Sequence, residues 1–241
     1  MLFLETMIKT AQIPYTDQEA ILEAFVAYPS EQRRPAVILC HAWGGRDAFI
    51  CNKAEIVAGW EYVGFALDIY GKDVLGKSKE ENAALKKPFI EDRSLLQRRL
   101  LKAFDLVSSL PYVDATRIAA LGFGFGGISA LDLARSGIPL RGAISVYGHF
   151  APSPLSKKPI RAKILALHGY RDPIINSAEL LAFEKEMDAA RADWQLHIYG
   201  DAMHAFANPT ANDMAAGIVY NSTSDRRAWT TIASFLKEVL S

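Results

Sequence analysis

Short, fully apolar segments alternate with longer amphipathic segments along most of this chain. Short apolar runs bounded by turn residues are typical of strands that are buried on both faces of a parallel sheet. Such strands are predicted at residues 36–40, 63–69, 117–122, 141–147, 163–167 and 194–199. Helices are predicted at residues 48–62, 100–110, 127–136, 177–192 and 225–240, the last capped by Ser224. This alternation predicts an α/β fold with a mostly parallel central sheet and helices on both faces.

Two regions depart from this alternation. Residues 8–28 predict two strands joined by a turn at residues 14–19, because apolar and polar positions alternate at the start of the second strand. Residues 72–99 are highly charged, contain Pro88 and are long for a loop, so we expect a helix within them that forms a cap segment. No repeat or Gly/Ser linker divides the chain, and residues 1–241 are expected to form a single domain.

Composition excludes several classes of partner. The 27 Lys and Arg residues balance 27 Asp and Glu residues, so the chain has no basic excess for binding a nucleic-acid backbone. No stretch approaches the roughly 18 uncharged apolar residues that a membrane span requires. Residues 1–10 include Glu5 and lack a basic leader, so we expect no secretory signal and a cytoplasmic protein.

The cysteines and histidines lack the spacing of a disulfide framework or a metal site. Cys40 and Cys51 could form a single bridge, but two free thiols in a reducing compartment are the interpretation that we favour. The 5 histidines form no H-E-x-x-H motif and no paired Cys/His cluster, so no metal is expected.

A glycine-rich turn at residues 121–127, Leu-Gly-Phe-Gly-Phe-Gly-Gly, is the most distinctive local feature. It follows a predicted strand and opens a predicted helix. Its glycines Gly122, Gly124 and Gly127 match G-x-G-x-x-G, which is typical of dinucleotide-binding turns. That fingerprint needs an acidic residue about 20 residues farther on, but residues 133–171 contain none. The nucleotide-binding interpretation is therefore the weaker one.

The alternative interpretation is a nucleophile elbow, G-x-Nu-x-G, which exposes one side chain above the sheet. Gly122 and Gly126 are then the flanking small residues, and the nucleophile position is occupied by Gly124. Asp172 follows a later predicted strand, and His204 follows the last one. Elbow, acid and histidine in this order are typical of α/β-hydrolases, in which all three lie beyond the carboxyl ends of parallel strands.

Five segments in this order resemble the dienelactone hydrolase family. They are His-Ala-Trp-Gly-Gly at 41–45, Asp-Ile-Tyr-Gly at 68–71, the turn at 121–127, His-Gly-Tyr-Arg-Asp at 168–172 and His-Ala-Phe at 204–206. The resemblance extends from about residue 20 to about residue 240 and implies an α/β-hydrolase fold. It also implies hydrolysis of the ester or lactone carbonyl of a small molecule, without a cofactor. In this family the elbow normally carries cysteine, sometimes serine.

The chain departs from the family pattern at two positions. Gly124 cannot attack a carbonyl, so weak or absent activity is expected. Asn208 lies near the position where members that bind the carboxylate of a dienelactone have an arginine, which disfavours a dienelactone as the substrate. Cys51 is the main alternative nucleophile, since a helix N-terminus lowers the pKa of a thiol; Ser129 and Cys40 are weaker alternatives.

The resemblance assigns roles to the remaining site residues. His204 would be the general base, and Asp172 would orient its imidazole, although each could instead be an ordinary loop residue. The amide of Phe125, with that of Ala42 or Trp43, would form an oxyanion hole.

Further side chains are candidates for contacting the substrate. They are His41, Trp43, Phe89, Arg93, Arg98 and His149. For the two histidines a structural role is the alternative, and for the charged segment at 72–99 the alternative is a solvated face.

Three functional hypotheses follow. The first is a dienelactone-hydrolase-like hydrolase in which glycine replaces the nucleophile. The second is a non-catalytic binding protein on the same scaffold, and nucleotide binding at the glycine turn is a third.

Overall fold

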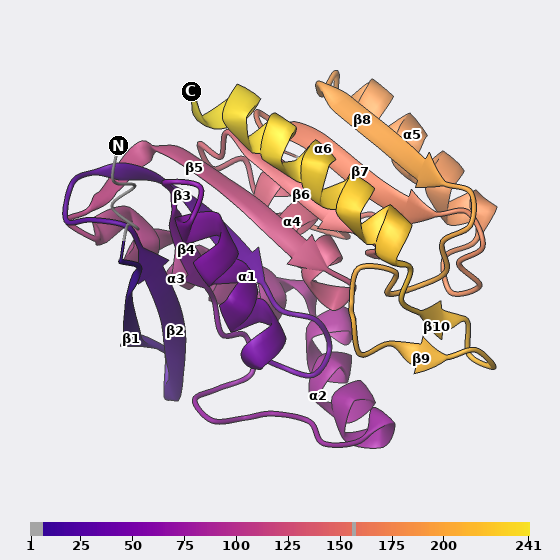
Figure 1. Cartoon of the computed structure of the whole chain (residues 1–241), viewed down its shortest axis with the longest axis horizontal. Helices are drawn as coiled ribbons and strands as arrows, with labels where there is room; N and C mark the ends of the chain where they lie inside the picture. Colours follow the sequence, from indigo (N-terminus) through magenta and orange to yellow (C-terminus); the bar gives the residue numbers. More distant parts are fainter. Residues whose placement is uncertain (1–6, 156–157) are drawn as a thin grey trace, which may run out of the picture.

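The computed structural model describes residues 7–155 and 158–241, which form an eight-stranded sheet covered by helices (Figure 1). The spatial order of the strands is β1-β2-β4-β3-β5-β6-β7-β8. Their bounds are Lys9–Asp17 (β1), Ala20–Tyr28 (β2), Arg34–Cys40 (β3), Val63–Ala66 (β4), Val113–Phe123 (β5), Gly142–Val146 (β6), Lys163–Gly169 (β7) and Trp194–Tyr199 (β8). Strands β3 to β8 pair in parallel, whereas β1 and β2 are antiparallel to their neighbours. The predicted α/β fold class with a mostly parallel sheet is confirmed.

Helices cover both faces of the sheet. Their bounds are Ala48–Ala58 (α1), Lys79–Glu91 (α2), Arg93–Ser109 (α3), Phe125–Arg135 (α4), Ser177–Ala189 (α5) and Ser222–Leu240 (α6). Residues of α1 and α6 belong to the same core layer as Val37 and Leu39 of β3, while residues of α3, α4 and α5 belong to the layer that contains Ala36 and Ile38 of the same strand. Because successive side chains of a strand point to opposite faces, this apolar run supplies both layers of the core.

Two boundaries in the first half of the chain correct the prediction. The first turn comprises only residues 18–19, and Pro14 lies within β1. This strand is at the edge of the sheet, where a residue without an amide hydrogen is tolerated. Helix α3 begins at Arg93 rather than at residue 100, because the Asp92 carboxylate accepts hydrogen bonds from the first-turn amides of Ser94 and Leu95 at 2.9 and 3.1 Å.

The C-terminal region also differs from the prediction. Helix α6 is capped by Asn221, whose side chain accepts a hydrogen bond from the amide of Ser224 at 2.9 Å, so Ser224 is inside the helix rather than its cap. Between β8 and α6 the chain forms a small two-stranded sheet of β9 (Asn212–Asp213) and β10 (Ile218–Val219). Strands of two residues are too short to produce a recognisable alternation.

Two further predictions concern the whole chain. Both cysteines are free, Cys40 buried and Cys51 partly buried, which confirms the interpretation as thiols. In the part of the chain that the structure describes, no helix is both long and apolar enough to cross a membrane.

Candidate functional site

The turn between β5 and α4 has room for a side chain at one position. A Cβ atom on Gly122 would lie 1.8 Å from the carbonyl oxygen of Gly126, and one on Gly126 would lie 2.0 Å from that of Cys40. Both positions therefore require glycine. Gly124 has φ +57° and ψ −113°, but a Cβ atom there would meet nothing nearer than Tyr147, at 3.6 Å. The glycines flanking position 124 thus serve close packing, while the space above position 124 is open.

His204 and Asp172 form a hydrogen-bonded pair beside this turn. His204 Nδ1 lies 2.8 Å from Asp172 Oδ2, and the side chain of Asp172 is fully buried. The other carboxylate oxygen accepts the amides of Ile174 at 2.8 Å and Ile175 at 3.3 Å. Burial raises the pKa of Asp172, but the hydrogen bonds from His204 and the two amides outweigh it and hold that pKa below its ordinary value. Because a carboxylate only accepts hydrogen bonds, Nδ1 of His204 carries a proton and Nε2 is left to act as a base.

The loop that carries His204 is held by β10. The amide of His204 donates to the carbonyl of Gly217 at 3.0 Å, and the amide of Val219 donates to the carbonyl of His204 at 3.0 Å. Ala205, the next residue, has φ +58°. These bonds fix the histidine backbone on both sides, so the small sheet contributes to the orientation of the imidazole.

Tyr147 links the glycine turn to the histidine. It lies directly after β6, has φ +41°, and its amide donates to the carbonyl of Leu167 at 2.8 Å. Its buried ring is the nearest neighbour of the space above Gly124, and its centroid lies 5.4 Å from that of the His204 imidazole. Position 124 and the imidazole therefore lie against the same aromatic ring.

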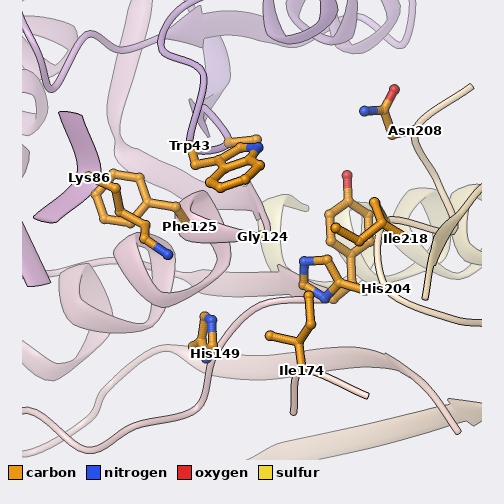
Figure 2. A pocket seen from close by; sticks show the side chains of 12 residues that line it. Trp43, Lys86, Gly124, Phe125, His149, Ile174, His204, Asn208 and Ile218 are labelled. Carbon is orange, nitrogen blue, oxygen red and sulfur yellow. The ribbon is translucent and has the colours of Figure 1, made fainter. Parts of the chain in front are cut away.

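A cavity of about 150 Å³ connects these groups (Figure 2). It is lined by Ala42, Trp43, Lys86, Gly124, Phe125, Tyr147, His149, Ile174, His204, Ala205, Asn208 and Ile218. The amides of Ala42 and Phe125 donate to no acceptor among the described residues. They are therefore available to a carbonyl oxygen bound in the cavity, as an oxyanion hole requires.

Several residues predicted to contact the substrate lie elsewhere, and the structure corrects these predictions. His41 is fully buried; Nδ1 lies 2.7 Å from the carbonyl of Ala42 and Nε2 accepts the amide of Ile69 at 3.2 Å, so it joins two loops. Phe89 is buried against Tyr70, with ring centroids 5.5 Å apart. His41, Phe89 and Tyr70 therefore do not line the cavity.

The two arginines of the charged segment are also outside the cavity. Arg93 is buried and donates two hydrogen bonds to the carboxylate of Asp132, at 2.7 and 2.5 Å, which joins α3 to α4. Arg98 donates to Asp17 at 2.8 Å. Both guanidinium groups are used in structural ion pairs, which corrects the predicted contact with a substrate.

Lys86 is a cavity residue that the sequence did not single out. It belongs to α2 and its ammonium group lies 5.8 Å from the centroid of the Trp43 ring. Burial lowers the pKa of Lys86, and it forms no ion pair with a described carboxylate. The sequence could not identify Lys86 as a cavity residue, because the pattern of charges in this segment does not show which lysine faces inward.

His149, which the sequence did propose, lines the cavity beside a second carboxylate. Its Nδ1 lies 3.5 Å from Glu179 Oε1, and the same oxygen accepts the amide of Phe150 at 2.5 Å. Burial raises the pKa of Glu179, but these contacts outweigh it and lower that pKa overall. Figure 2 shows His149 and His204 on the side of the cavity near Ile174, with Trp43 and Lys86 facing them.

The alternative nucleophiles do not line the cavity. Burial raises the pKa of the Cys51 thiol and of the Cys40 thiol, which opposes the activation expected at a helix N-terminus. Ser129 is buried and donates to the carbonyl of Phe125 at 3.0 Å. Among the described residues no group of three or more His, Cys, Asp or Glu side chains could hold a metal ion.

Comparison with known proteins places these features in a family context. Residues 22–240 match the dienelactone hydrolase family. A protein of Saccharolobus solfataricus described as "Putative carboxymethylenebutenolidase" is 26% identical over 264 residues, which covers 95% of this chain and 98% of that protein. A protein of Bradyrhizobium sp described as "Probable 2-oxo-3-(5-oxofuran-2-ylidene)propanoate lactonase" is 30% identical over 200 residues, or 76% of this chain and 78% of the relative.

A solved structure shows the same architecture over nearly the whole chain. It is a dienelactone hydrolase-like promiscuous phosphotriesterase from metagenomic libraries, with a TM-score of 0.93 and 26% identity. The match covers 97% of this chain and 99% of that one. The similarity therefore concerns the architecture of the whole domain, the central sheet with its two helical layers.

Proposed function

Since this chain belongs to the dienelactone hydrolase family, we propose that its cavity binds a small ester or lactone with the carbonyl carbon above Gly124. The observation that carries the proposal is the His204–Asp172 pair at 2.8 Å, beside a turn with room for a side chain at position 124. That turn is a nucleophile elbow in which the nucleophile is replaced by glycine. The amides of Ala42 and Phe125 supply the oxyanion hole.

The chemistry of the cavity is restricted by the missing nucleophile. With cysteine at position 124, Nε2 of His204 would take the thiol proton and later return it to the leaving alcohol. With glycine, the turn supplies no nucleophile, and Nε2 is left to activate a nucleophile from solution such as water, which is not held by a covalent bond to the protein. We therefore expect slow hydrolysis by the chain with Gly124. Removing a nucleophile commonly lowers the rate by about 10⁶ where the catalytic groups act as a unit.

The preferred substrate is an ester or lactone that carries a negative charge. Lys86 places a cation on the cavity wall, with no described carboxylate paired to it. The name of the Bradyrhizobium relative denotes a lactone with a carboxylate group, a propanoate. Lys86 could provide the charge that an arginine near Asn208 would otherwise supply, although through a single ammonium group rather than a bidentate guanidinium.

Restoring the nucleophile tests this proposal. Gly124→Cys should raise the turnover of an activated aryl ester by at least about two orders of magnitude, since the added side chain enters open space beside His204. Initial rates of aryl alcohol release measure the effect, with Gly124→Ala as the matched control that adds a carbon but no nucleophile. An unchanged rate in a folded Gly124→Cys protein would contradict the assignment of the elbow.

A binding protein on the hydrolase scaffold is the second candidate, and Gly124 itself favours it. Such a protein would bind a carboxylate-bearing lactone without turnover, which isothermal titration calorimetry of the chain with Gly124 would detect. Binding with no gain of turnover in Gly124→Cys would select this function. Turnover after the substitution would select the hydrolase scaffold with a latent catalytic pair.

A further inference from the structure

We infer that this protein can take its attacking group from solution, so that a small thiol bound above Gly124 accepts the acyl group of the ester. The inference rests on the proposed function of the same cavity. It adds a second substrate and a different product, a thioester in place of an acid. The chain would then be a thiol-dependent acyl transferase rather than a hydrolase.

The open space above Gly124 determines the size of the thiol. A Cβ atom built at position 124 has its nearest neighbours, two carbons of the Tyr147 ring, at 3.6 and 3.8 Å, which is ordinary van der Waals contact. A cysteine side chain consists of that carbon and a sulfur atom, and methanethiol contains the same two heavy atoms. Because methanethiol is not bonded to Gly124 Cα, its carbon lies farther from that atom than a Cβ atom would, within the cavity of about 150 Å³ that Gly124, Tyr147 and His204 line.

His204 is in place to activate a thiol bound there. The Tyr147 ring that borders the space also lies 5.4 Å from the His204 imidazole, measured between centroids. Asp172 holds Nδ1 at 2.8 Å, which leaves Nε2 as the acceptor of a thiol proton and stabilises the imidazolium that forms. A thiolate beside an imidazolium is the ion pair that activates cysteine nucleophiles in proteins.

The reaction balances without an oxidant or a reductant. The thiol proton moves to His204 Nε2 while the sulfur forms a bond to the carbonyl carbon of the ester. The resulting oxyanion accepts hydrogen bonds from the amides of Ala42 and Phe125, which have no acceptor among the described residues. The carbon–oxygen bond then breaks, and the leaving alkoxide takes the proton from His204. The products are a thioester and an alcohol, and no acyl group becomes attached to the protein.

A dissolved thiol recovers only part of the rate of a tethered one. Well-oriented intramolecular groups have effective concentrations of about 10⁵ M or more. At about 10 mM methanethiol we therefore expect a rate far below that of Gly124→Cys, but at least about tenfold above the sum of the rates with protein alone and with thiol alone. The rate should also saturate with thiol concentration, because the thiol binds before it reacts.

The experiment uses the full chain with Gly124, an activated aryl ester and methanethiol. Aryl alcohol release gives the rate, and mass spectrometry identifies the methyl thioester and shows that the intact protein carries no acyl group. Gly124→Ala should abolish the acceleration by filling the space, and circular dichroism checks its fold because alanine is strained at φ +57°. His204→Asn should abolish it without altering the backbone of the turn. A branched thiol, 2-methylpropane-2-thiol, should give a smaller acceleration than methanethiol, because its three methyl groups need more of the cavity of about 150 Å³ that the ester also occupies.

The outcomes separate this inference from the proposed function. Acceleration that saturates, yields thioester and is lost in both variants supports the inference. Turnover by Gly124→Cys together with no thiol effect on the chain with Gly124 overturns the inference and leaves the proposed function standing. Equal acceleration in Gly124→Ala also overturns it, since attack would then occur outside the space above Gly124. If Gly124→Cys and the thiol are both without effect, the proposed function fails as well.

Discussion

At the scale of single residues, the buried carboxylate of Asp172 decides how the candidate base behaves. Its two oxygens accept hydrogen bonds from His204 and from the amides of Ile174 and Ile175, so the ionised form is fully satisfied although its side chain is buried. An ionised group that is buried and completely hydrogen-bonded orients its partner strongly. The same contacts make Asp172 a pH-dependent contributor to stability.

Replacing Asp172 by asparagine should destabilise the protein more at neutral pH than in acid. The pKa of Asp172 in the folded protein is below the ordinary value of 3.8, so ionisation favours the folded state. This contribution is fully present above that ordinary value and is lost as the pH falls through the lowered pKa. Urea unfolding of wild type and Asp172→Asn near pH 7 and about pH 3 measures the difference.

Asp201→Asn serves as the control, because Asp201 is exposed and, among the described residues, its carboxylate pairs only with the exposed Arg171. It should change the unfolding free energy little at either pH. An equal loss of stability at both pH values for Asp172→Asn would contradict the assignment of a stabilising carboxylate.

At the scale of elements, α2 closes one side of the cavity through a single lysine. The helix is mostly exposed, and Phe89 is its only buried side chain. Lys86 nevertheless turns toward the cavity and Trp43, while the adjacent Lys87 pairs with Glu91 in solvent. The segment at 72–99 therefore combines a solvated face with one inward-facing cation.

Substitution of Lys86 should distinguish charged from neutral substrates. In the Gly124→Cys background, Lys86→Gln should raise KM for a carboxylate-bearing ester about tenfold, since a hydrogen bond to a charged group contributes about 1.5–3 kcal/mol. KM for a neutral ester of the same size should change little. Lys87→Gln removes the same charge from the neighbouring position and should affect neither substrate. Equal KM changes for both esters would show that Lys86 contributes packing instead of charge.

At the scale of the whole molecule, buried ion pairs connect three helices on one face of the sheet. Asp132 of α4 accepts hydrogen bonds from Arg93 of α3 at 2.7 and 2.5 Å and from Arg135 at 3.2 Å. Arg135 also pairs with Glu186 of α5 at 2.6 Å. Helix α4, which begins at the glycine-rich turn, is thereby joined to α3 and to α5. The network therefore helps to hold that turn in place.

Removing the central carboxylate should be strongly destabilising. Asp132→Ala leaves the buried guanidinium of Arg93 without its partner, and loss of one member of a buried pair costs about 3–5 kcal/mol. Urea unfolding monitored by circular dichroism measures this cost. Asp114→Ala, which breaks the more exposed pair with Arg117, should cost about 1 kcal/mol or less. Similar costs for the two variants would contradict a special role for the buried network.

The sequence by itself determined the parallel sheet and the order of the site residues along the chain. Apolar runs such as residues 36–40 can be recognised because burial on both faces removes polar positions altogether. Gly122 and Gly126 could be identified because the close approach of strand and helix permits no other residue. Both features can be recognised because each is a pattern within a few consecutive residues, although the group that Gly126 approaches, the carbonyl of Cys40, is distant in the sequence.

Only the tertiary structure decided which polar side chains meet at the cavity. Arg93 and Lys86 lie in the same charged segment, yet one is buried against Asp132 and the other lines the cavity. Likewise, β10 holds His204 although its two residues produce no pattern. The physical reason is that hydrophobic periodicity shows which face of a single helix or strand is buried. Contacts between polar side chains of different elements depend instead on how those elements pack on the sheet.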